Sequence, residues 1–146
     1  MSQQLKTPTL IDVRGPRFSA TLTVIVLAVA LATQNAWVLA FQAVVFAIGA
    51  IRGPQFTPYA FIFKRIVKPR LRGEVITEDS RPPQFAQSVG FLFALAGLLG
   101  AAIGSAAVFN VAVGFALAAA FLNSVFNYCL GCEMYLLVLR IRTRNN

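Results

Sequence analysis

The residues best suited to chemistry in this chain are its two cysteines, which lie close together near the C-terminal end. Cys129 and Cys132 form a Cys-x-x-Cys motif that is followed directly by Glu133. A thiolate attacks soft sulfur electrophiles such as disulfides, and a second thiol nearby can resolve the mixed product. Because helix positions i, i+3 and i+4 share a face, we expect both thiols and the carboxylate to point the same way, with Glu133 assisting proton transfer.

Three interpretations of the cysteine pair are open at this point. The first is a thiol redox or sulfur relay, in which the pair cycles between thiols and a transient disulfide. The second is metal binding, although one such motif supplies only two soft ligands and the chain has no histidine. The third is packing between helices, because cysteine is small and apolar. We predict the relay; the sequence identifies no metal site and no cofactor.

Glu133 is the single ionisable carboxylate between residues 82 and 139. A charged group inside a bilayer is costly, so we expect this side chain to be protonated, paired or facing a wet cleft. The alternative places Glu133 at headgroup level, paired with Arg140 or with an arginine of the central loop.

The composition is that of a membrane protein. Of the 146 residues, 58% are hydrophobic and 12% are charged, and the charged fraction is about half that of soluble domains. Residues 18–51 contain no charged side chain, which is typical of membrane spans. We predict one all-α, polytopic membrane domain over residues 1–146, with four transmembrane helices as two hairpins at residues 18–33, 36–51, 85–107 and 108–139. The last run is too long for one perpendicular helix, so it either tilts or emerges into the headgroups.

The basic residues predict the orientation. The formal net charge is +8, and the cations fall outside the apolar runs in three clusters: Lys6, Arg14 and Arg17; Arg52, Lys64, Arg65, Lys68, Arg70, Arg72 and Arg81; Arg140, Arg142 and Arg144. Cytoplasmic loops are enriched in Lys and Arg, so we place both termini and the loop at residues 52–84 on the cytoplasmic side of the plasma membrane. A cleavable signal ending after Ala32 is the rival for the first run, but the inverted product would expose the basic loop outside.

Anionic lipid is the partner that such clusters favour, and their placement argues against nucleic acid. We expect Arg14, Arg17 and Arg81 to contact lipid, a partner surface or Glu133. We expect Lys64 and Arg65 to contact lipid or a partner surface. Residues 59–68 alternate apolar bulk with cations and precede Pro69. They predict an amphipathic helix at the interface, whereas the plainer alternative is a basic loop that only sets the topology.

Two further patterns concern how the helices pack. Asp12, Arg14, Pro16 and Phe18 before the first span recur as Asp79, Arg81, Pro83 and Phe85 before the third. This internal sequence repeat predicts two hairpins of the same orientation. We expect each aspartate to cap the helix that follows it or to pair with its neighbouring arginine. Small residues at Ala96, Gly100 and Gly104 lie four positions apart and predict a helix-packing face; the neighbour is either in the same chain or in a second copy.

The stretches at residues 14–18, 81–86 and 129–135 together resemble domain-of-unknown-function family 4395, over nearly the whole chain. The resemblance implies a bacterial, often actinobacterial, membrane protein without an established activity. It also implies gene neighbours of the thioredoxin-like and sulfurtransferase classes, which favours the relay interpretation.

Our prediction is a cytoplasm-facing dithiol that exchanges electrons or sulfane sulfur with a soluble thioredoxin-like or rhodanese-like partner. The first alternative is an accessory or scaffold subunit of a membrane complex, including a homo-oligomer, that uses the small-residue face. The second alternative is a small-solute permease. The sequence does not decide whether the protein is an enzyme.

Overall fold

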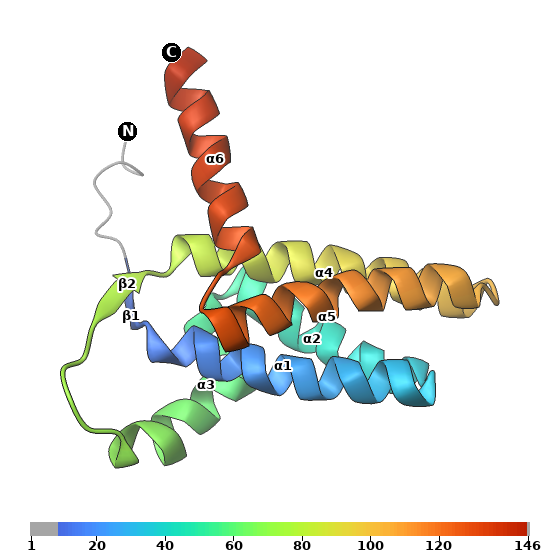
Figure 1. Ribbon diagram of the computed structural model, residues 1–146, viewed down its shortest axis with the longest axis horizontal. Coiled ribbons are helices and arrows are strands. Elements are labelled where there is room, and N and C mark those ends of the chain that lie inside the picture. The colour runs from blue at the N-terminus through green and yellow to red at the C-terminus, as the bar shows by residue number, and fades with distance from the viewer. Residues whose placement is uncertain (1–8, 146) are drawn as a thin grey trace.

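The computed structural model describes residues 9–145, and in this part of the chain the structure is helical apart from one short ribbon (Figure 1). The main helices are α1 (Arg14–Thr33), α2 (Ala36–Ile51), α4 (Arg81–Ala102), α5 (Ala106–Phe126) and α6 (Leu130–Asn145). The strands are β1 (Leu10–Asp12) and β2 (Thr77–Asp79). The predicted all-α class is confirmed, while Lys6 of the first basic cluster lies outside the described residues.

Four of these helices, α1, α2, α4 and α5, lie side by side as a bundle (Figure 1). Around the bundle α1 packs on α2, α2 on α4, α4 on α5, and α5 on α1. The buried core residues come from all four helices: Leu27, Ala30, Leu39, Ala43, Phe46, Ala94, Phe109, Val113 and Ala116. At the end with the hairpin turns, Gln34 Nε2 donates to Asn110 Oδ1 at 2.7 Å. The two hairpins therefore form one packed unit.

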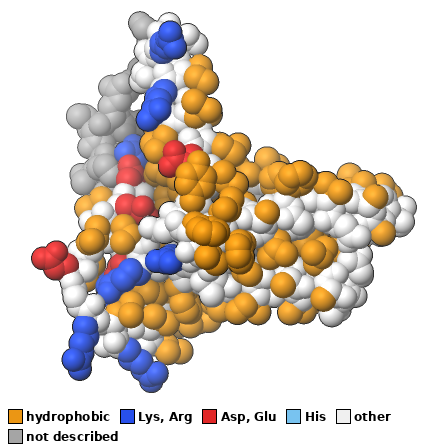
Figure 2. All heavy atoms as spheres, viewed as in Figure 1, with side chains coloured by type: hydrophobic (Ala, Val, Ile, Leu, Met, Phe, Trp, Pro, Cys, Tyr) orange, Lys and Arg blue, Asp and Glu red, His pale blue; other side chains and the backbone are white. Residues whose placement is uncertain are grey.

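The outer surface of the bundle is apolar as well. Large hydrophobic side chains face outward on every bundle helix, for example Ile25, Phe41, Leu92 and Phe115. By length and composition, α1, α4 and α5 are each long and apolar enough to cross a membrane, and α2 is a shorter apolar helix. Lys, Arg, Asp and Glu gather at the other end, around β1, β2, α3 and α6 (Figure 2). A bilayer is the solvent that such a surface requires.

The predicted fourth span at residues 108–139 is wrong in its extent. Asn127 adopts a left-handed conformation at φ 54° and ends α5, and its backbone N–H bonds the Leu122 carbonyl. Tyr128 N–H also bonds this carbonyl, at 3.1 Å. After this turn the chain starts α6, which projects steeply away from the bundle (Figure 1). Hydropathy is nearly continuous across this point, so composition did not reveal the bend, whereas asparagine is one of the few residues that adopt this conformation readily.

The third predicted span, at residues 85–107, is shifted toward the N-terminus. Helix α4 begins at Arg81 because prolines are tolerated in a first helical turn. It ends at Ala102, and Gly104 lies in the following turn at φ +77° with no atom within 4 Å of a Cβ placed on it. Gly104 is therefore not part of a packing face, which corrects the prediction. Gly100 is part of a packing face, because a Cβ on it would lie 2.7 Å from the backbone nitrogen of Phe109 in α5. Gly97 and Gly90 pack equally closely against side chains of α2.

The internal sequence repeat is reflected in the two-stranded ribbon formed by β1 and β2. Strands β1 and β2 are antiparallel, with Leu10 opposite Asp79, Ile11 opposite Glu78 and Asp12 opposite Thr77. Because Asp12 and Asp79 are corresponding residues of the sequence repeat, Ile11 and Glu78 correspond too and face each other. Such a pairing is what an approximate two-fold rotation axis produces when it passes between Ile11 and Glu78 and relates the two strands to each other. The chain thus contains two repeats: β1, α1, α2 and the α3 segment, then β2, α4, α5 and α6.

The α3 segment (residues 58–70) is the helix predicted in the central loop. It consists of α3 (Pro58–Ile62), a π-helical stretch η3 (Phe63–Val67) and a 3₁₀ turn η4 (Lys68–Arg70), preceded by the turn η2 (Pro54–Phe56). It packs on α1 as α6 packs on α4. The ring of Phe63 lies 5.8 Å from Phe18, and the ring of Tyr135 lies 5.8 Å from Phe85, the counterpart of Phe18. The repeat therefore extends through its third helix.

Candidate functional site

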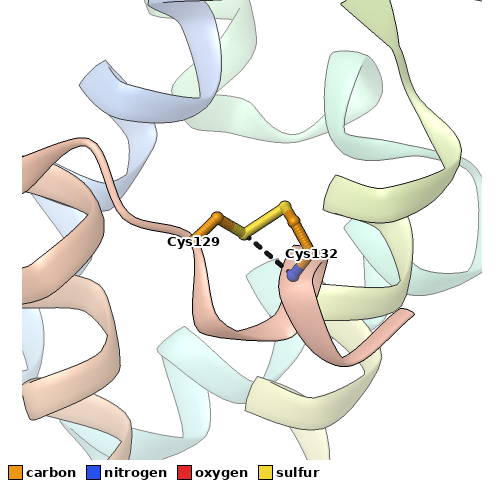
Figure 3. The surroundings of a disulfide bond; sticks show 2 residues. All are labelled: Cys129 and Cys132. Carbon is orange, nitrogen blue, oxygen red and sulfur yellow. Dashed lines mark hydrogen bonds between the residues drawn. A yellow bond between two sulfur atoms is a disulfide. The ribbon is translucent and has the colours of Figure 1, made fainter. Parts of the chain in front are cut away.

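Cys129 and Cys132 form a disulfide at the start of α6, with their Cα atoms 5.2 Å apart (Figure 3). Both side chains are half-buried. Cys129 precedes the first residue of α6, so the helical spacing behind the expected common face applies only to Cys132 and Glu133. The two cysteines lie together because the disulfide joins them. In this oxidised state neither sulfur is a free thiolate that could ligate a metal ion.

The backbone around the motif is that of a capped helix start. Cys129 Sγ accepts a hydrogen bond from Cys132 N–H at 3.1 Å (dashed in Figure 3). The Cys129 carbonyl accepts from Glu133 N–H at 3.0 Å, which closes the first helical turn. Cys129 therefore holds the N-cap position, where serine, threonine or asparagine usually satisfies a free N–H of the first turn.

The first repeat contains the same cap with a hydroxyl in place of the sulfur. Thr57 Oγ1 accepts from Ala60 N–H at 3.1 Å, and the Thr57 carbonyl accepts from Phe61 N–H at 3.1 Å. Thr57 and Ala60 thus correspond to Cys129 and Cys132. The fold builds a capped helix start at both places, and only the second carries a pair of sulfurs.

Helix α6 is held against α4 directly behind the motif. Gly131, between the two cysteines, is buried, and a Cβ on it would lie 2.5 Å from Ala86 Cα of α4. Only glycine permits this approach. One turn later the Tyr135 ring contacts the Phe85 ring edge-on. The disulfide is therefore fixed on a rigid junction between α4, α6 and the end of α5.

Arg17 fixes the end of α5 just before the motif. Its guanidinium donates to the carbonyls of Ser124 at 2.9 Å and Val125 at 3.4 Å. These carbonyls lack helical partners at a C-terminus, and a cation there also complements the helix dipole. In the other repeat Gln84, the counterpart of Arg17, donates to the Ala50 carbonyl near the end of α2 at 2.8 Å.

The two predicted aspartate–arginine pairs are both formed. Arg14 donates to Asp12 through its backbone N–H and its guanidinium, and Arg81 binds Asp79 in the same way. The side-chain hydrogen bonds from these arginines hold the pKa of Asp12 and of Asp79 below its usual value, against the opposing effect of burial. Arg14 and Arg81 are thus engaged in starting α1 and α4.

The other predicted contact residues lie apart from the disulfide or make no ion pair. Lys64 Nζ donates to the Gln55 carbonyl at 3.0 Å, and Arg65 stacks over the Phe61 ring at 4.7 Å. Glu133 is exposed, and within residues 9–145 it forms no salt bridge with Arg140 or any other cation. The structure therefore brings together the two cysteines, with Glu133 one residue beyond them. Of the predicted arginines, Arg17 binds the end of α5 next to the motif, while Arg14 and Arg81 bind their own aspartates.

Sequence reasoning missed two residues of this site, Asn127 and Gly131, and also the counterpart of its cap in the first repeat, Thr57. The turn at Asn127 has a recognisable signal, an asparagine followed by a potential helix cap. Thr57 and Ala60 recur as Cys129 and Cys132 when the repeat is continued past the second helix. Gly131 has no sequence signal of its own, because its role depends on contact with α4.

The fold and the site together define a helical protein with a membrane-type surface and a Cys-x-x-Cys disulfide at a helix start. The chain belongs to the family Domain of unknown function (DUF4395), whose model matches residues 11–140. Searches of curated proteins and of solved structures give no match.

Proposed function

We propose that this protein is a membrane thiol–disulfide exchange component in which Cys129 is the nucleophile and Cys132 is the resolving thiol. The observation that carries the proposal is the hydrogen bond from Cys132 N–H to Cys129 Sγ at the first turn of α6. A helix N-terminus presents unpaired N–H groups and partial positive charge, which stabilise a thiolate relative to a thiol. The corresponding cap in the first repeat is made by the Thr57 hydroxyl, so capping alone does not call for a pair of sulfurs.

The exchange proceeds in two balanced steps. The Cys129 thiolate attacks one sulfur of a partner disulfide, forms a mixed disulfide and releases the first partner thiolate. The Cys132 thiolate then attacks Cys129 Sγ, closes the intramolecular disulfide and releases the second. The partner disulfide is reduced by two electrons and the cysteine pair is oxidised; the two thiol protons pass to the partner. A reduced thioredoxin-like dithiol runs the same steps backward to regenerate the pair.

The proposed topology has four spans, α1, α2, α4 and α5. Helix α2, with 16 residues, extends about 24 Å, so it needs local thinning of the bilayer. The ribbon, the α3 segment and α6 then lie at the basic end, which the bias of Lys and Arg places in the cytoplasm. There thiols are kept reduced, and a disulfide is usually transient or catalytic.

Single-cysteine variants test the assigned roles. Cys132→Ser retains the nucleophile, and Cys129→Ser is the matched control with one thiol in the same motif. The probe is a purified thioredoxin-like protein whose one remaining cysteine carries a thionitrobenzoate disulfide. We expect Cys132→Ser to form a covalent complex and release thionitrobenzoate at least about tenfold faster than the control near neutral pH. Equal rates for the two variants would contradict the assignment of Cys129.

Glu133 keeps its proposed role as a proton carrier, since it is exposed and adjacent to Cys132. If it transfers protons, Glu133→Gln slows resolution of the mixed disulfide several-fold but leaves the equilibrium extent of oxidation unchanged. An unchanged or faster rate would remove Glu133 from the mechanism, because loss of a nearby negative charge by itself favours the thiolate.

A further inference from the structure

A cavity of about 200 Å³ lies in the first repeat, between β1, the start of α1 and the α3 segment. Its walls come from β1, the first turns of α1, the turn η2, the α3 segment and Gln87 of α4. The volume is far more than the ~15 Å³ that a single water needs. The proposed thiol exchange uses none of these residues.

The cavity arises from a difference between the two repeats. In the second repeat, Gly131 lets α6 lie directly on Ala86 of α4. The corresponding residues of the first repeat are Tyr59 and Ser19. Tyr59 is buried and donates its hydroxyl proton to Gln42 Oε1 of α2 at 2.7 Å. The start of the α3 segment is therefore anchored to α2, and space is left between it and α1.

More positive than negative side chains line the cavity. Lys64 and Lys68 line it together with Asp12. Asp12 is already bound by Arg14 at 2.8 Å, and Lys68 Nζ approaches it only at 3.8 Å. Lys64 uses one of its three donors on the Gln55 carbonyl. Both ammonium groups thus retain donors for an anion.

Hydrogen-bond acceptors line the same cavity. Gln55 and Gln87 are lining residues, and the Oε1 atom of each is buried without a hydrogen-bond partner among the described residues. Ser19 adds a hydroxyl. Gln55 Oε1 packs against Gly53, and Gln87 Oε1 packs against Gly49 of α2. Buried acceptors of this kind are normally satisfied, and a ligand with hydroxyl groups would satisfy them once each amide turns toward the cavity. Apolar walls from Ile11 and Phe63 complete the site. Its cationic half suits an anion, and its amide oxygens suit hydroxyl groups of the same ligand.

We propose that this cavity binds a phosphate ester that carries free hydroxyls, such as a phosphoglycerol group, with the phosphate on Lys64 and Lys68 and the hydroxyls on Gln55 and Gln87. The chemistry is common to a phospholipid headgroup and to a soluble polyol phosphate. Exposed apolar side chains on the α3 segment, Phe61, Ile62 and Ile66, flank the cationic rim and would accommodate acyl chains.

The test is binding to the purified protein in detergent, followed by native mass spectrometry and thermal unfolding. The probes are dioctanoyl phosphatidylglycerol, glycerol 3-phosphate and inorganic phosphate, with dioctanoyl phosphatidylcholine as the zwitterionic comparison. We expect one saturable phosphatidylglycerol site. Competition by glycerol 3-phosphate assigns the site to the headgroup chemistry alone, and lack of competition assigns it to the lipid. Absence of a saturable site for either ester overturns the proposal.

Matched variants locate the site. The double variant Lys64→Gln/Lys68→Gln should weaken binding at least about tenfold, as expected when two charge-assisted contacts are lost. Arg65→Gln is the control, because Arg65 is a neighbouring cation that stacks on Phe61 and does not line the cavity. Gln87→Leu should weaken phosphatidylglycerol but not inorganic phosphate. Equal weakening by Arg65→Gln would indicate diffuse surface attraction and overturn the proposal.

Discussion

Cys129 caps α6 as Thr57 caps α3. In each case the side chain accepts the N–H of the residue three positions on, at 3.1 Å in both. The scaffold of the candidate site is thus an ordinary helix start that the fold forms twice. Its second copy differs in having sulfur at the cap and at the residue that donates to it, and this difference is what makes thiol chemistry possible there.

The contact between Gly131 and Ala86 predicts a severe effect of a single methyl group. Gly131→Ala would place a Cβ 2.5 Å from Ala86 Cα, so α6 must move away from α4. We expect a loss of about 1–3 kcal/mol in the free energy of unfolding, together with faster reduction of the disulfide by dithiothreitol. Thermal unfolding and reduction kinetics of the purified protein measure the two effects.

Two variants make this test specific. Gly114→Ala is the control, because a Cβ at this helical position meets no atom within 4 Å; it should leave stability unchanged or raise it by up to about 1 kcal/mol. Adding Ala86→Gly to Gly131→Ala should restore part of the loss. If Gly131→Ala behaves like Gly114→Ala, the close packing of α6 on α4 is wrong.

The aspartate–arginine pairs predict how stability depends on pH. Hydrogen bonds from Arg14 and Arg81 lower the pKa values of Asp12 and Asp79 in the folded protein. The folded state therefore binds fewer protons than the unfolded state in this range, and stability should be complete above about pH 4 and decline as the pH falls further. Burial and the charge of Asp79 raise the pKa of Glu78 in the folded protein. The effect of Glu78 on the pH dependence of stability is therefore opposite: ionisation of Glu78 lowers the stability as the pH rises.

Thermal unfolding between about pH 3 and pH 7 tests these signs. Asp12→Asn should cost about 1 kcal/mol near neutral pH and flatten the acid decline, whereas Glu78→Gln should be neutral or stabilising there. Glu74→Gln is the control, since Glu74 is exposed in the segment before β2. An acid decline that is identical in Asp12→Asn and the unmodified protein would refute the role of this pair.

Much of the helical framework could be predicted from the sequence. The two uncharged runs predicted α1 and α2 to within a few residues of their ends, because a helix that crosses a bilayer requires a long stretch of apolar residues. The Asp12–Arg14 and Asp79–Arg81 pairs were also predictable, since both partners are local. The disulfide between Cys129 and Cys132 was expected as a transient state, and the structure contains it.

The rest depends on contacts that a single sequence does not display. Asn127 is a single polar residue in a largely apolar run, so the mean hydropathy of the run does not mark the turn, and the separate helix α6 was not predicted. The packing face of α4 was placed on Ala96, Gly100 and Gly104. Gly100 does make a close contact, as Gly90 and Gly97 do, whereas Gly104 lies beyond the end of the helix, since the phase and the end of a helix are set by its neighbours. The cavity at Lys64 and Lys68 depends on how far α3 stands from α1.

The cap at Thr57 gives a prediction for the first repeat. Thr57→Ala removes the acceptor for Ala60 N–H in a buried position, and should cost about 1 kcal/mol. Hydrogen exchange should increase selectively at residues 59–62. Thr57→Ser retains the hydroxyl and should behave like the unmodified protein in both respects. If alanine and serine have the same effect, the hydroxyl is not the cap.

The most direct measurement counts reactive thiols in native membranes with a maleimide reagent that adds a fixed mass at each free cysteine. After mild oxidation we predict no added label, and after treatment with dithiothreitol two labels; the change should reverse on reoxidation. The variant Cys132→Ser should show one label in both conditions. Two labels under all conditions would mean that Cys129 and Cys132 never join, and the exchange function would be wrong.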